Sequence, residues 1–334
     1  MSVKALVLAP FHRDALEQLA RDGEVVYEPW LETGQIADPV ELGERLAKGG
    51  FDVLIIEADF VFEETFEAAP GLRFVGACRG DLGEHVELEA ALDRGVTVVN
   101  TPGRNAVAVA ELTIALMLGL ARRITTVHNV IRRGMWASAV DNLKAWQGVE
   151  LSGKTAGLVG FGAIGHAVGK RLAALEMEVV AYDPFVSEGE GGQGDGGDRE
   201  AGVSFVGLEE LLSRSDFVSI HAALTAGTRG LLGERELSRM KPSAFLVNTA
   251  RAAIVNEDAL LEALRSGRIA GAGLDVYMVE PLPPDSPWLK FDNVLLTPHM
   301  GGATADVVRR HSEMILNDLQ RWQRGERPLH LLTG

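Results

Sequence analysis

Short apolar runs alternate with amphipathic stretches along most of this chain of 334 residues, and no other feature constrains its fold as strongly. The runs are rich in valine, leucine and isoleucine, which is typical of strands buried on both faces of a parallel sheet. They occupy residues 3–8, 53–56, 72–77 and 96–99, and then 155–159, 179–182, 217–220, 244–247, 270–274 and 294–296. Two series of strands separated by helices predict an α/β protein with two Rossmann-like, doubly wound parallel-sheet domains.

The two series also suggest the domain boundaries. A polar stretch at residues 100–105 ends the first series, and one amphipathic helix at about 302–324 follows the second. That helix is too short to form a domain, so we expect it to pack back onto the first sheet. The prediction is a discontinuous domain of residues 1–101 plus 300–334 and an inserted domain of residues 102–299. Such a chain crosses between its domains twice, and we expect a hinge and a ligand cleft there.

The predicted helix at residues 106–122 is apolar on almost every side between residues 108 and 120. A helix of this kind is buried on every side. Its neighbours are either its own sheet or a second copy of the chain. We favour the second copy and therefore predict a homodimer that forms through this helix.

The formal net charge of -15, from 47 acidic and 32 basic residues, argues against polyanionic partners. It repels phosphate backbones and anionic lipid surfaces, so we expect neither nucleic acid nor a membrane as a partner. A small anionic substrate would need a local cluster of positive charge.

The single cysteine, Cys78, excludes an internal disulfide framework and fits a reducing compartment. The N-terminus does not resemble a signal peptide, and no apolar stretch reaches the roughly 18 residues of a membrane span. We therefore expect a cytoplasmic protein. We expect no metal site, because no histidine or cysteine spacing matches one. Residues 187–202, rich in glycine and acidic side chains, are interpreted as a flexible surface loop.

The strongest motif is a glycine-rich turn between a predicted strand and a predicted helix. Its candidate cofactor contacts are Gly160, Gly162, Ala163, Ile164 and Gly165. In such a turn the first glycine permits the tight bend, the second lets the backbone approach a pyrophosphate, and the third lets helix and strand pack closely. Asp183 ends the next strand, where a carboxylate accepts hydrogen bonds from ribose hydroxyls and repels a 2′-phosphate. The sequence therefore predicts NAD, rather than NADP, as the cofactor.

Three later segments each follow a predicted strand and carry one residue suited to chemistry. These residues are Arg251, Glu280 and His299. The carboxyl ends of parallel strands meet at one edge of a sheet, so the three side chains can converge in one crevice. Taken singly, they are equally a surface charge, a turn residue before proline and a residue at a helix start. Most of the other histidines, His311 among them, are interpreted as surface or packing residues.

The chain resembles the D-isomer-specific 2-hydroxyacid dehydrogenase family almost from end to end. The resemblance lies in the segments VVNTPGRNAVAVAELTIALML, GKTAGLVGFGAIG, VNTARAAIVNEDAL, AGLDVY, EPL and NVLLTPHMGG. It implies two hinged domains, a dimer, and a catalytic trio of Arg251, Glu280 and His299. It also implies adenosine contacts from Leu224 and Thr228. Near the nicotinamide, the implied cofactor contacts are Thr249, Ala250, Arg251, Asp275, His299 and Gly301.

The residue types in the trio suit a hydride transfer. Reduction of a ketone develops an alkoxide, and a histidine with an unperturbed pKa of about 6.5 can deliver a proton to it. Glu280, if bonded to the other ring nitrogen, orients His299 and stabilises its imidazolium. The planar fork of Arg251 holds a carboxylate or carbonyl and supplies the positive charge that the acidic surface lacks. The nicotinamide carries the hydride.

The substrate's carboxylate is expected to meet backbone N–H groups at Arg79, Gly80 and Asp81, with Arg251 and His299 as the other substrate contacts. Many relatives carry Gly-x-Gly at this loop, and this chain departs from that pattern. Two interpretations of Arg79 stay open. It pairs with a second anionic group of the substrate, such as a phosphate or distal carboxylate, or it forms a structural ion pair with Asp81 or Glu84. The side chain of the substrate is therefore not predicted.

We predict an NAD-dependent D-2-hydroxyacid dehydrogenase that acts as a reductase of a small 2-oxoacid. Phosphoglycerate dehydrogenase is an alternative, although the chain ends before the C-terminal regulatory domain of longer relatives. The alternative of another class is an NAD(H)-sensing protein like the corepressors that share this fold. A sensor would bind NADH without turnover, so a panel of 2-oxoacids separates the two classes.

Overall fold

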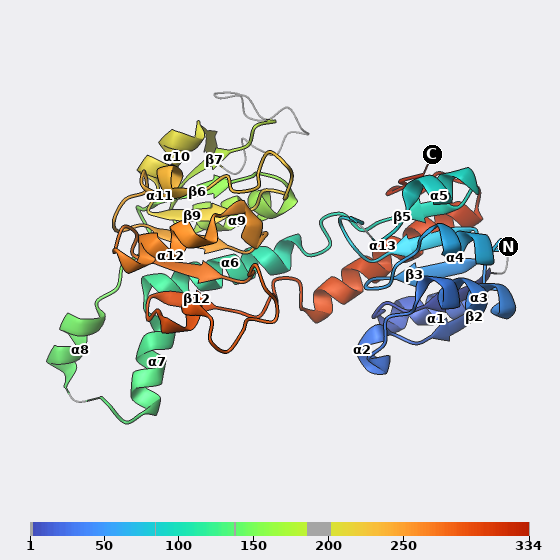
Figure 1. Ribbon diagram of the computed structural model, residues 1–334, viewed down its shortest axis with the longest axis horizontal. Helices are drawn as coiled ribbons and strands as arrows, with labels where there is room; N and C mark the ends of the chain where they lie inside the picture. The colour runs from blue at the N-terminus through green and yellow to red at the C-terminus, as the bar shows by residue number, and fades with distance from the viewer. Residues whose placement is uncertain (1–2, 84, 137, 186–201, 334) are drawn as a thin grey trace. The chain divides into compact units, whose positions relative to one another are not determined.

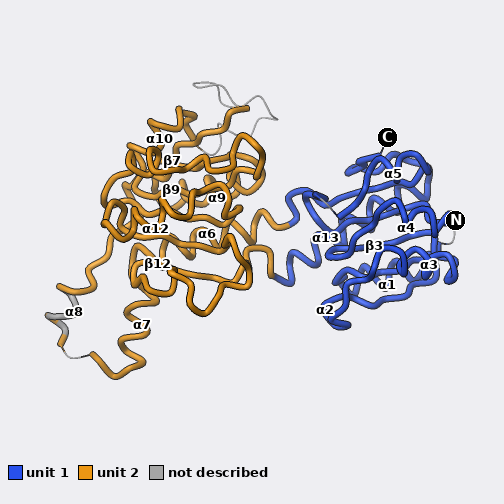
Figure 2. Tube along the Cα trace, viewed as in Figure 1, with its two compact units in different colours: residues 1–104, 304–334 blue, residues 105–303 orange. Residues whose placement is uncertain are grey.

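The protein was analysed as a computed structural model, which describes residues 3–83, 85–136, 138–185 and 202–333 (Figure 1). The chain divides into two compact units, Met1–Arg104 with Thr304–Gly334 (unit 1) and Asn105–Ala303 (unit 2), coloured separately in Figure 2. Each unit is built on one parallel sheet with helices on both faces, so the predicted α/β class is confirmed. Most of the predicted loop at residues 187–202 lies outside the described residues.

Unit 1 holds a five-stranded parallel sheet in the order β2-β1-β3-β4-β5. Its strands are β1 (Val3–Val7), β2 (Gly23–Tyr27), β3 (Val53–Ile56), β4 (Phe74–Ala77) and β5 (Thr97–Val99). The chain runs outward from β1 on both sides, as in a doubly wound sheet. The apolar runs did not predict β2, because this edge strand buries none of its residues fully.

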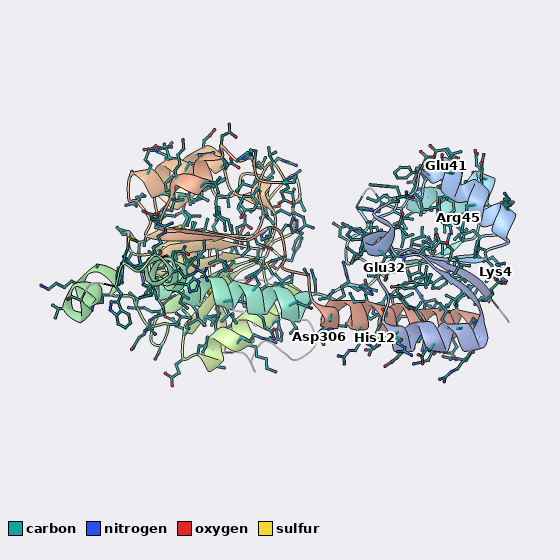
Figure 3. The ribbon with its side chains drawn as sticks, turned by 90° about the horizontal axis from the view of Figure 1, so that it is seen from below. Lys4, His12, Glu32, Glu41, Arg45 and Asp306 are labelled. Atoms are coloured by element: carbon teal, nitrogen blue, oxygen red, sulfur yellow. The ribbon has the colours of Figure 1, made fainter. Side chains whose placement is uncertain are left out.

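The helices of unit 1 cover both faces of this sheet. They are α1 (Arg13–Asp22), α2 (Trp30–Thr33), α3 (Pro39–Gly49), α4 (Glu63–Ala68), α5 (Leu88–Asp93) and α13 (Ala305–Gln323). Leu6 of β1 packs with Leu46 of α3 on one face, whereas Val7 packs with α1 and with Ile315 of α13 on the other. Figure 3 shows α1 and α13 side by side, with His12 and Asp306 labelled near their starts. The C-terminal helix therefore belongs to the core of the unit that begins the chain.

Unit 2 holds a seven-stranded parallel sheet in the order β12-β11-β10-β9-β6-β7-β8. Its strands are β6 (Thr155–Val159), β7 (Glu178–Tyr182), β8 (Val203–Phe205), β9 (Phe217–Ile220), β10 (Phe245–Asn248), β11 (Gly271–Leu274) and β12 (Val294–Leu296). The direction of winding reverses between β6 and β9. In open α/β sheets, ligands bind beyond the carboxyl ends of the strands at such a reversal.

The helices of unit 2 likewise cover both sheet faces. They are α6 (Ala106–Ala121), α7 (Ile124–Arg132), α8 (Ala139–Trp146), α9 (Ala163–Ala174), α10 (Leu208–Arg214), α11 (Glu234–Leu237), α12 (Glu257–Arg265), and the 3-10 turns Ala252–Ile254 and Pro287–Lys290. α6 and α9 pack on one face, and α10 and α12 on the other. Among the described residues, no helix has the length and apolar character needed to cross a bilayer.

Helix α6 is buried by its own unit. Leu116, Met117 and Leu120 pack with α9 and with the strands of the same sheet. The all-round apolar pattern that suggested a dimer helix is therefore explained by burial inside unit 2, and only a few α6 residues, such as Leu118, remain exposed. α7 extends away from the sheet (Figure 1) and exposes Ile124 and Ile131.

Candidate active site

The strands of unit 2 end in register, and this places the candidate residues along one edge. Pairing joins one row of residues across the sheet: Tyr182, Val159, Ile220, Asn248, Leu274 and Leu296. The residues that follow them in the chain are Asp183, Gly160, His221, Thr249, Asp275 and Thr297. Since neighbouring strands lie about 4.8 Å apart, the predicted cofactor and catalytic segments of unit 2 all start from one edge.

The glycines of the turn after β6 have different roles. Gly160 has a φ of 91°, and a Cβ built there would lie 2.5 Å from the backbone nitrogen of Ala222. A Cβ at Gly165 would lie 2.5 Å from the carbonyl oxygen of Gly160. A Cβ at Gly162 would meet nothing within 4 Å. Gly160 and Gly165 thus serve close packing, whereas Gly162 borders open space at the start of α9, next to Ala163 and Ile164.

Asp183 ties the end of β7 to the glycine turn. Its Oδ2 accepts a hydrogen bond from the Phe161 N–H at 2.9 Å, and its Oδ1 accepts one from the Phe185 N–H at 3.1 Å. Each carboxylate oxygen can accept a second hydrogen bond, so ribose hydroxyls can still bind. The other expected adenosine contacts, Leu224 and Thr228, lie in the loop after β9, where the Thr228 hydroxyl donates to the Ala223 carbonyl.

His221 is the first residue after β9, the strand next to β6, and its backbone packs against the glycine turn. Its carbonyl carbon would lie 2.8 Å from a Cβ at Gly160. Burial lowers the pKa of His221 to about 3, so the ring is neutral. The Nε2 atom pairs with the Ser219 hydroxyl at 2.9 Å, while the buried Nδ1 has no hydrogen-bond partner in the described part of the chain.

Arg251 is exposed on a short loop after β10, and the buried side-chain amide of Asn248 holds this loop in shape. The Asn248 side chain accepts a hydrogen bond from the Ala250 N–H and donates one to the Arg251 carbonyl, both at 3.0 Å. Thr249 turns inward instead, and its hydroxyl lies 3.0 Å from that of Thr113 on α6. The loop is thus fixed at its base while the guanidinium stays accessible.

Glu280 and His299 form a direct pair. Oε2 of Glu280 lies 2.7 Å from Nδ1 of His299, and the side chains are 36% and 49% exposed. Burial raises the pKa of Glu280, but hydrogen bonds from His299 and the Tyr277 N–H, with the charges of His299 and Arg251, outweigh it and lower the pKa overall. An ionised Glu280 can only accept, so Nδ1 carries the hydrogen and Nε2 is left as the site of proton exchange.

Asp275 is buried and holds the loop that carries His299. Its Oδ1 accepts hydrogen bonds from the Thr297 hydroxyl at 2.6 Å and the Met300 N–H at 2.9 Å, and its Oδ2 accepts one from the Gly301 N–H at 2.9 Å. His299 has a φ of 52°, in the left-handed region that side chains disfavour. These bonds keep the histidine in that conformation. The predicted contacts of Asp275 and Gly301 with a nicotinamide remain predictions.

A cavity of about 570 Å³ adjoins the Glu280–His299 pair inside unit 2. Besides Tyr277 and Thr297, its lining is largely apolar and comprises Pro281, Leu282, Leu289, Leu296 and Pro298. Low-polarity surroundings strengthen the attraction between a carboxylate and an imidazolium.

The predicted substrate loop lies at the corresponding edge of the sheet in unit 1. The Arg79 guanidinium donates to the Glu57 carbonyl at 3.2 Å, and Oδ1 of Asp81 accepts a hydrogen bond from the Gly83 N–H at 3.0 Å. The Gly80 carbonyl accepts one from the Asn100 amide at 2.7 Å. Glu84 lies outside the described residues, and both interpretations of Arg79 remain predictions.

The same edge of unit 1 holds a second histidine centre. Nη1 of Arg104 lies 2.9 Å from Nδ1 of His311, and Nη2 of Arg104 lies 2.7 Å from Oε1 of Glu57. Nε2 of His311 lies 2.7 Å from the Pro10 carbonyl. A guanidinium cannot accept and a carbonyl cannot donate, so His311 is the neutral Nε2–H tautomer. Sequence reasoning missed this centre, since its members are far apart in the chain.

The geometry of unit 2 agrees with its similarity to known proteins. The family model of the D-isomer specific 2-hydroxyacid dehydrogenase NAD binding domain matches residues 114–301. The chain belongs to the D-isomer specific 2-hydroxyacid dehydrogenase family. It therefore stands among NAD-dependent oxidoreductases that act on CH–OH groups.

Several members of this dehydrogenase family match most of the chain. A D-3-phosphoglycerate dehydrogenase of Archaeoglobus fulgidus is 37% identical over 325 residues, which is 97% of this chain but 58% of that protein. A glyoxylate reductase of Korarchaeum cryptofilum is 40% identical over 275 residues, 82% of this chain and 80% of the relative. The solved structure of the TT0316 protein of Thermus thermophilus has a TM-score of 0.83 at 36% identity, and the match covers 98% of this chain and 99% of that one.

The edge of unit 2 fits the NAD of this dehydrogenase family. The open space at Gly162 beside the start of α9 suits a pyrophosphate, because N–H groups at a helix N-terminus attract anions. The Asp183 carboxylate suits the ribose. The buried Nδ1 of His221 has no hydrogen-bond partner among the described residues, so it can still bind a polar group. Sequence reasoning missed three side chains that fix the site. Thr113 contacts Thr249 from helix α6, the Tyr277 hydroxyl bonds to the Thr297 carbonyl, and the Asn248 amide shapes its own loop.

Proposed function

We propose that this protein is an NAD-dependent reductase of a small 2-oxoacid, giving the D-2-hydroxyacid, with Arg251, Glu280 and His299 as its catalytic residues. The observation that carries the proposal is the 2.7 Å pair of Glu280 and His299, which starts from the same sheet edge as the glycine turn. A histidine with one nitrogen bound to a carboxylate and the other free is suited to general acid–base catalysis.

Each residue has a distinct task in this proposal. The Arg251 guanidinium binds the carboxylate or carbonyl of the substrate through paired N–H donors. Nε2 of protonated His299 gives its proton to the oxygen on C2 during reduction, and takes it back in the reverse reaction. Glu280 holds the ring and stabilises its imidazolium. When bound, NADH supplies the hydride to C2.

We assign NAD binding to unit 2, through the contacts named for residues 160–165, Asp183, residues 249–251 and the 297–301 loop. Unit 1 is proposed to contribute substrate contacts at Arg79, Gly80 and Asp81. We further propose a cytoplasmic homodimer. The buried face of α6 no longer supports this dimer. Its support is instead the exposed apolar side chains Leu118, near the end of α6, and Ile124 and Ile131 on α7, which could form the interface.

The function is tested by following NADH oxidation with glyoxylate, hydroxypyruvate, pyruvate, 3-phosphohydroxypyruvate and longer 2-oxoacids. Turnover of at least one with D stereochemistry is expected. 3-Phosphohydroxypyruvate belongs in the panel because the Archaeoglobus relative is named for that chemistry. NADH binding without turnover of any panel member would favour the sensor class instead.

The cofactor assignment is tested at Asp183. Replacement by alanine removes the carboxylate that repels a 2′-phosphate, so the ratio of kcat/KM for NADH over NADPH should fall by at least about tenfold. Adding an arginine nearby should lower it further. An unchanged ratio in Asp183→Ala would remove Asp183 from the ribose site.

A further inference from the structure

Tyr277 bonds to Glu280 and to the backbone two residues before His299. Its backbone N–H donates to Oε1 of Glu280 at 2.9 Å. Its hydroxyl lies 2.9 Å from the carbonyl oxygen of Thr297 and 3.0 Å from that of Leu274. We infer that Tyr277 is a positioning residue for proton transfer by His299, an inference that rests on the proposed function.

These bonds close a ring. It runs from the Tyr277 N–H through the Glu280 carboxylate to Nδ1 of His299, then back along the chain to Thr297 and to the Tyr277 hydroxyl. Tyr277 thus holds two groups. One is the Glu280 carboxylate oxygen that faces away from the imidazole, and the other is the Thr297 carbonyl, two positions before His299. A hydroxyl has one hydrogen, so the two carbonyl oxygens share it.

The Tyr277 hydroxyl links the ends of β11 and β12, which are otherwise joined mainly by Thr297. The Thr297 N–H donates to the Leu274 carbonyl at 3.0 Å, and the Thr297 hydroxyl donates to Asp275. Asp275 holds the loop after His299, through Met300 and Gly301, whereas Tyr277 holds it before His299. Without the hydroxyl, the Thr297 carbonyl loses this donor, and the chain before His299 is held less tightly relative to Glu280.

Tyr277 positions and does not itself transfer a proton. Its hydroxyl is engaged by two backbone carbonyls, and the ring is half-buried against the core of unit 2. Burial raises the pKa of Tyr277 to about 12, so it remains a donor wherever the enzyme is assayed. Its effect must therefore appear in turnover and in the pH profile of the reaction.

The test compares Tyr277→Phe with Tyr27→Phe in the full chain. Tyr27 is a matched control, because its hydroxyl also bonds to the backbone, at the Phe11 N–H, but in unit 1. Tyr277→Phe should lower kcat for 2-oxoacid reduction about fivefold and leave the KM for NADH unchanged. It should also move the alkaline limb of the pH profile to lower pH by about half a unit, since Glu280 stabilises the imidazolium less when the chain that carries His299 is held less tightly.

A double-mutant cycle shows whether the effect passes through Glu280. In a Glu280→Gln background, Tyr277→Phe should change kcat less than twofold. A lower Tm with unchanged kcat and pH profile would overturn the inference, as would an equal loss in Tyr27→Phe or a full fivefold loss in the Gln background. If the wild-type protein shows no turnover that depends on His299, the proposed function itself is wrong. That result differs from normal His299-dependent turnover that Tyr277→Phe leaves unchanged, which would contradict only the role of Tyr277.

Discussion

Two histidines at the carboxyl ends of two parallel sheets have opposite environments. His299 in unit 2 is half exposed and pairs with a carboxylate, whereas His311 in unit 1 is fully buried and pairs with a guanidinium. Burial, with the charge of Arg104, lowers the pKa of His311 to about 4, and the opposing effects of the Pro10 carbonyl and Glu57 do not offset this. The comparison teaches that the partner and the solvent, not the residue type, decide which histidine can exchange protons.

The largest expected effect is at His299. Replacement by alanine removes the proton donor, and turnover should fall by more than about 100-fold, a typical contribution of general acid catalysis. Because the side chain is half exposed, the Tm should change little. Steady-state kinetics with the best substrate of the panel measures it. Turnover near that of wild type would break the comparison, since His299 would then be as inert as His311.

Glu280→Gln tests the carboxylate that distinguishes the two centres. The amide keeps the shape but loses the charge, so turnover should fall about tenfold. Reduction needs protonated His299, so its rate declines at alkaline pH. Loss of the neighbouring negative charge favours the neutral ring, so this decline should move to lower pH by about one unit. A profile of kcat/KM against pH that coincides with wild type would contradict the role of Glu280.

The smallest effect on activity is expected at His311. Glutamine can accept from Arg104 and donate to the Pro10 carbonyl as the neutral histidine does, so His311→Gln should leave turnover within about twofold. Its effect should appear in stability instead. The folded pKa of about 4 lies below the unfolded value of 6.5, so the unfolded chain takes up the proton first as pH falls. Stability from His311 is therefore complete above pH 6.5 and is lost between pH 6.5 and 4, by about 3 kcal/mol at most.

Urea unfolding from pH 7 to pH 4 measures this loss, and His311→Gln should flatten the curve relative to wild type. His12→Gln is the control, because His12 lies at the start of α1 beside α13 and is partly exposed (Figure 3). Equal slopes in wild type and His311→Gln would show that His311 titrates as an ordinary surface histidine. A large loss of turnover in His311→Gln would instead indicate that His311 takes part in the reaction as a second acid–base group.

Sequence periodicity predicted the strands that are buried on both faces, because such strands must be apolar throughout. It missed β2 and β8, which lie at sheet edges and need no continuous apolar run. It also attributed the apolar surface of α6 to a second subunit, since a pattern states that a face is buried but not by what. α9 and the neighbouring strands are what cover that helix.

The candidate site divides in the same way. Residue types and their positions after predicted strands made Arg251, Glu280 and His299 candidates, and the resemblance to the dehydrogenase family selected them as a catalytic trio. The supporting contacts were not predicted. Asp275 was selected only as a nicotinamide contact, and the hydrogen bonds by which it, Asn248 and Tyr277 hold the loops of the site are visible only in the structure.

The amino-acid sequence by itself determined the α/β class, the dinucleotide turn and the chemistry available at the strand ends, because these follow from local composition and spacing. Only the tertiary structure decided which strand ends share a row, and hence which histidine meets a carboxylate and which meets a guanidinium. The reason is physical: a pKa depends on charges and solvent within a few ångströms in space, and the partners of His311 lie some 200 to 300 positions away in the chain.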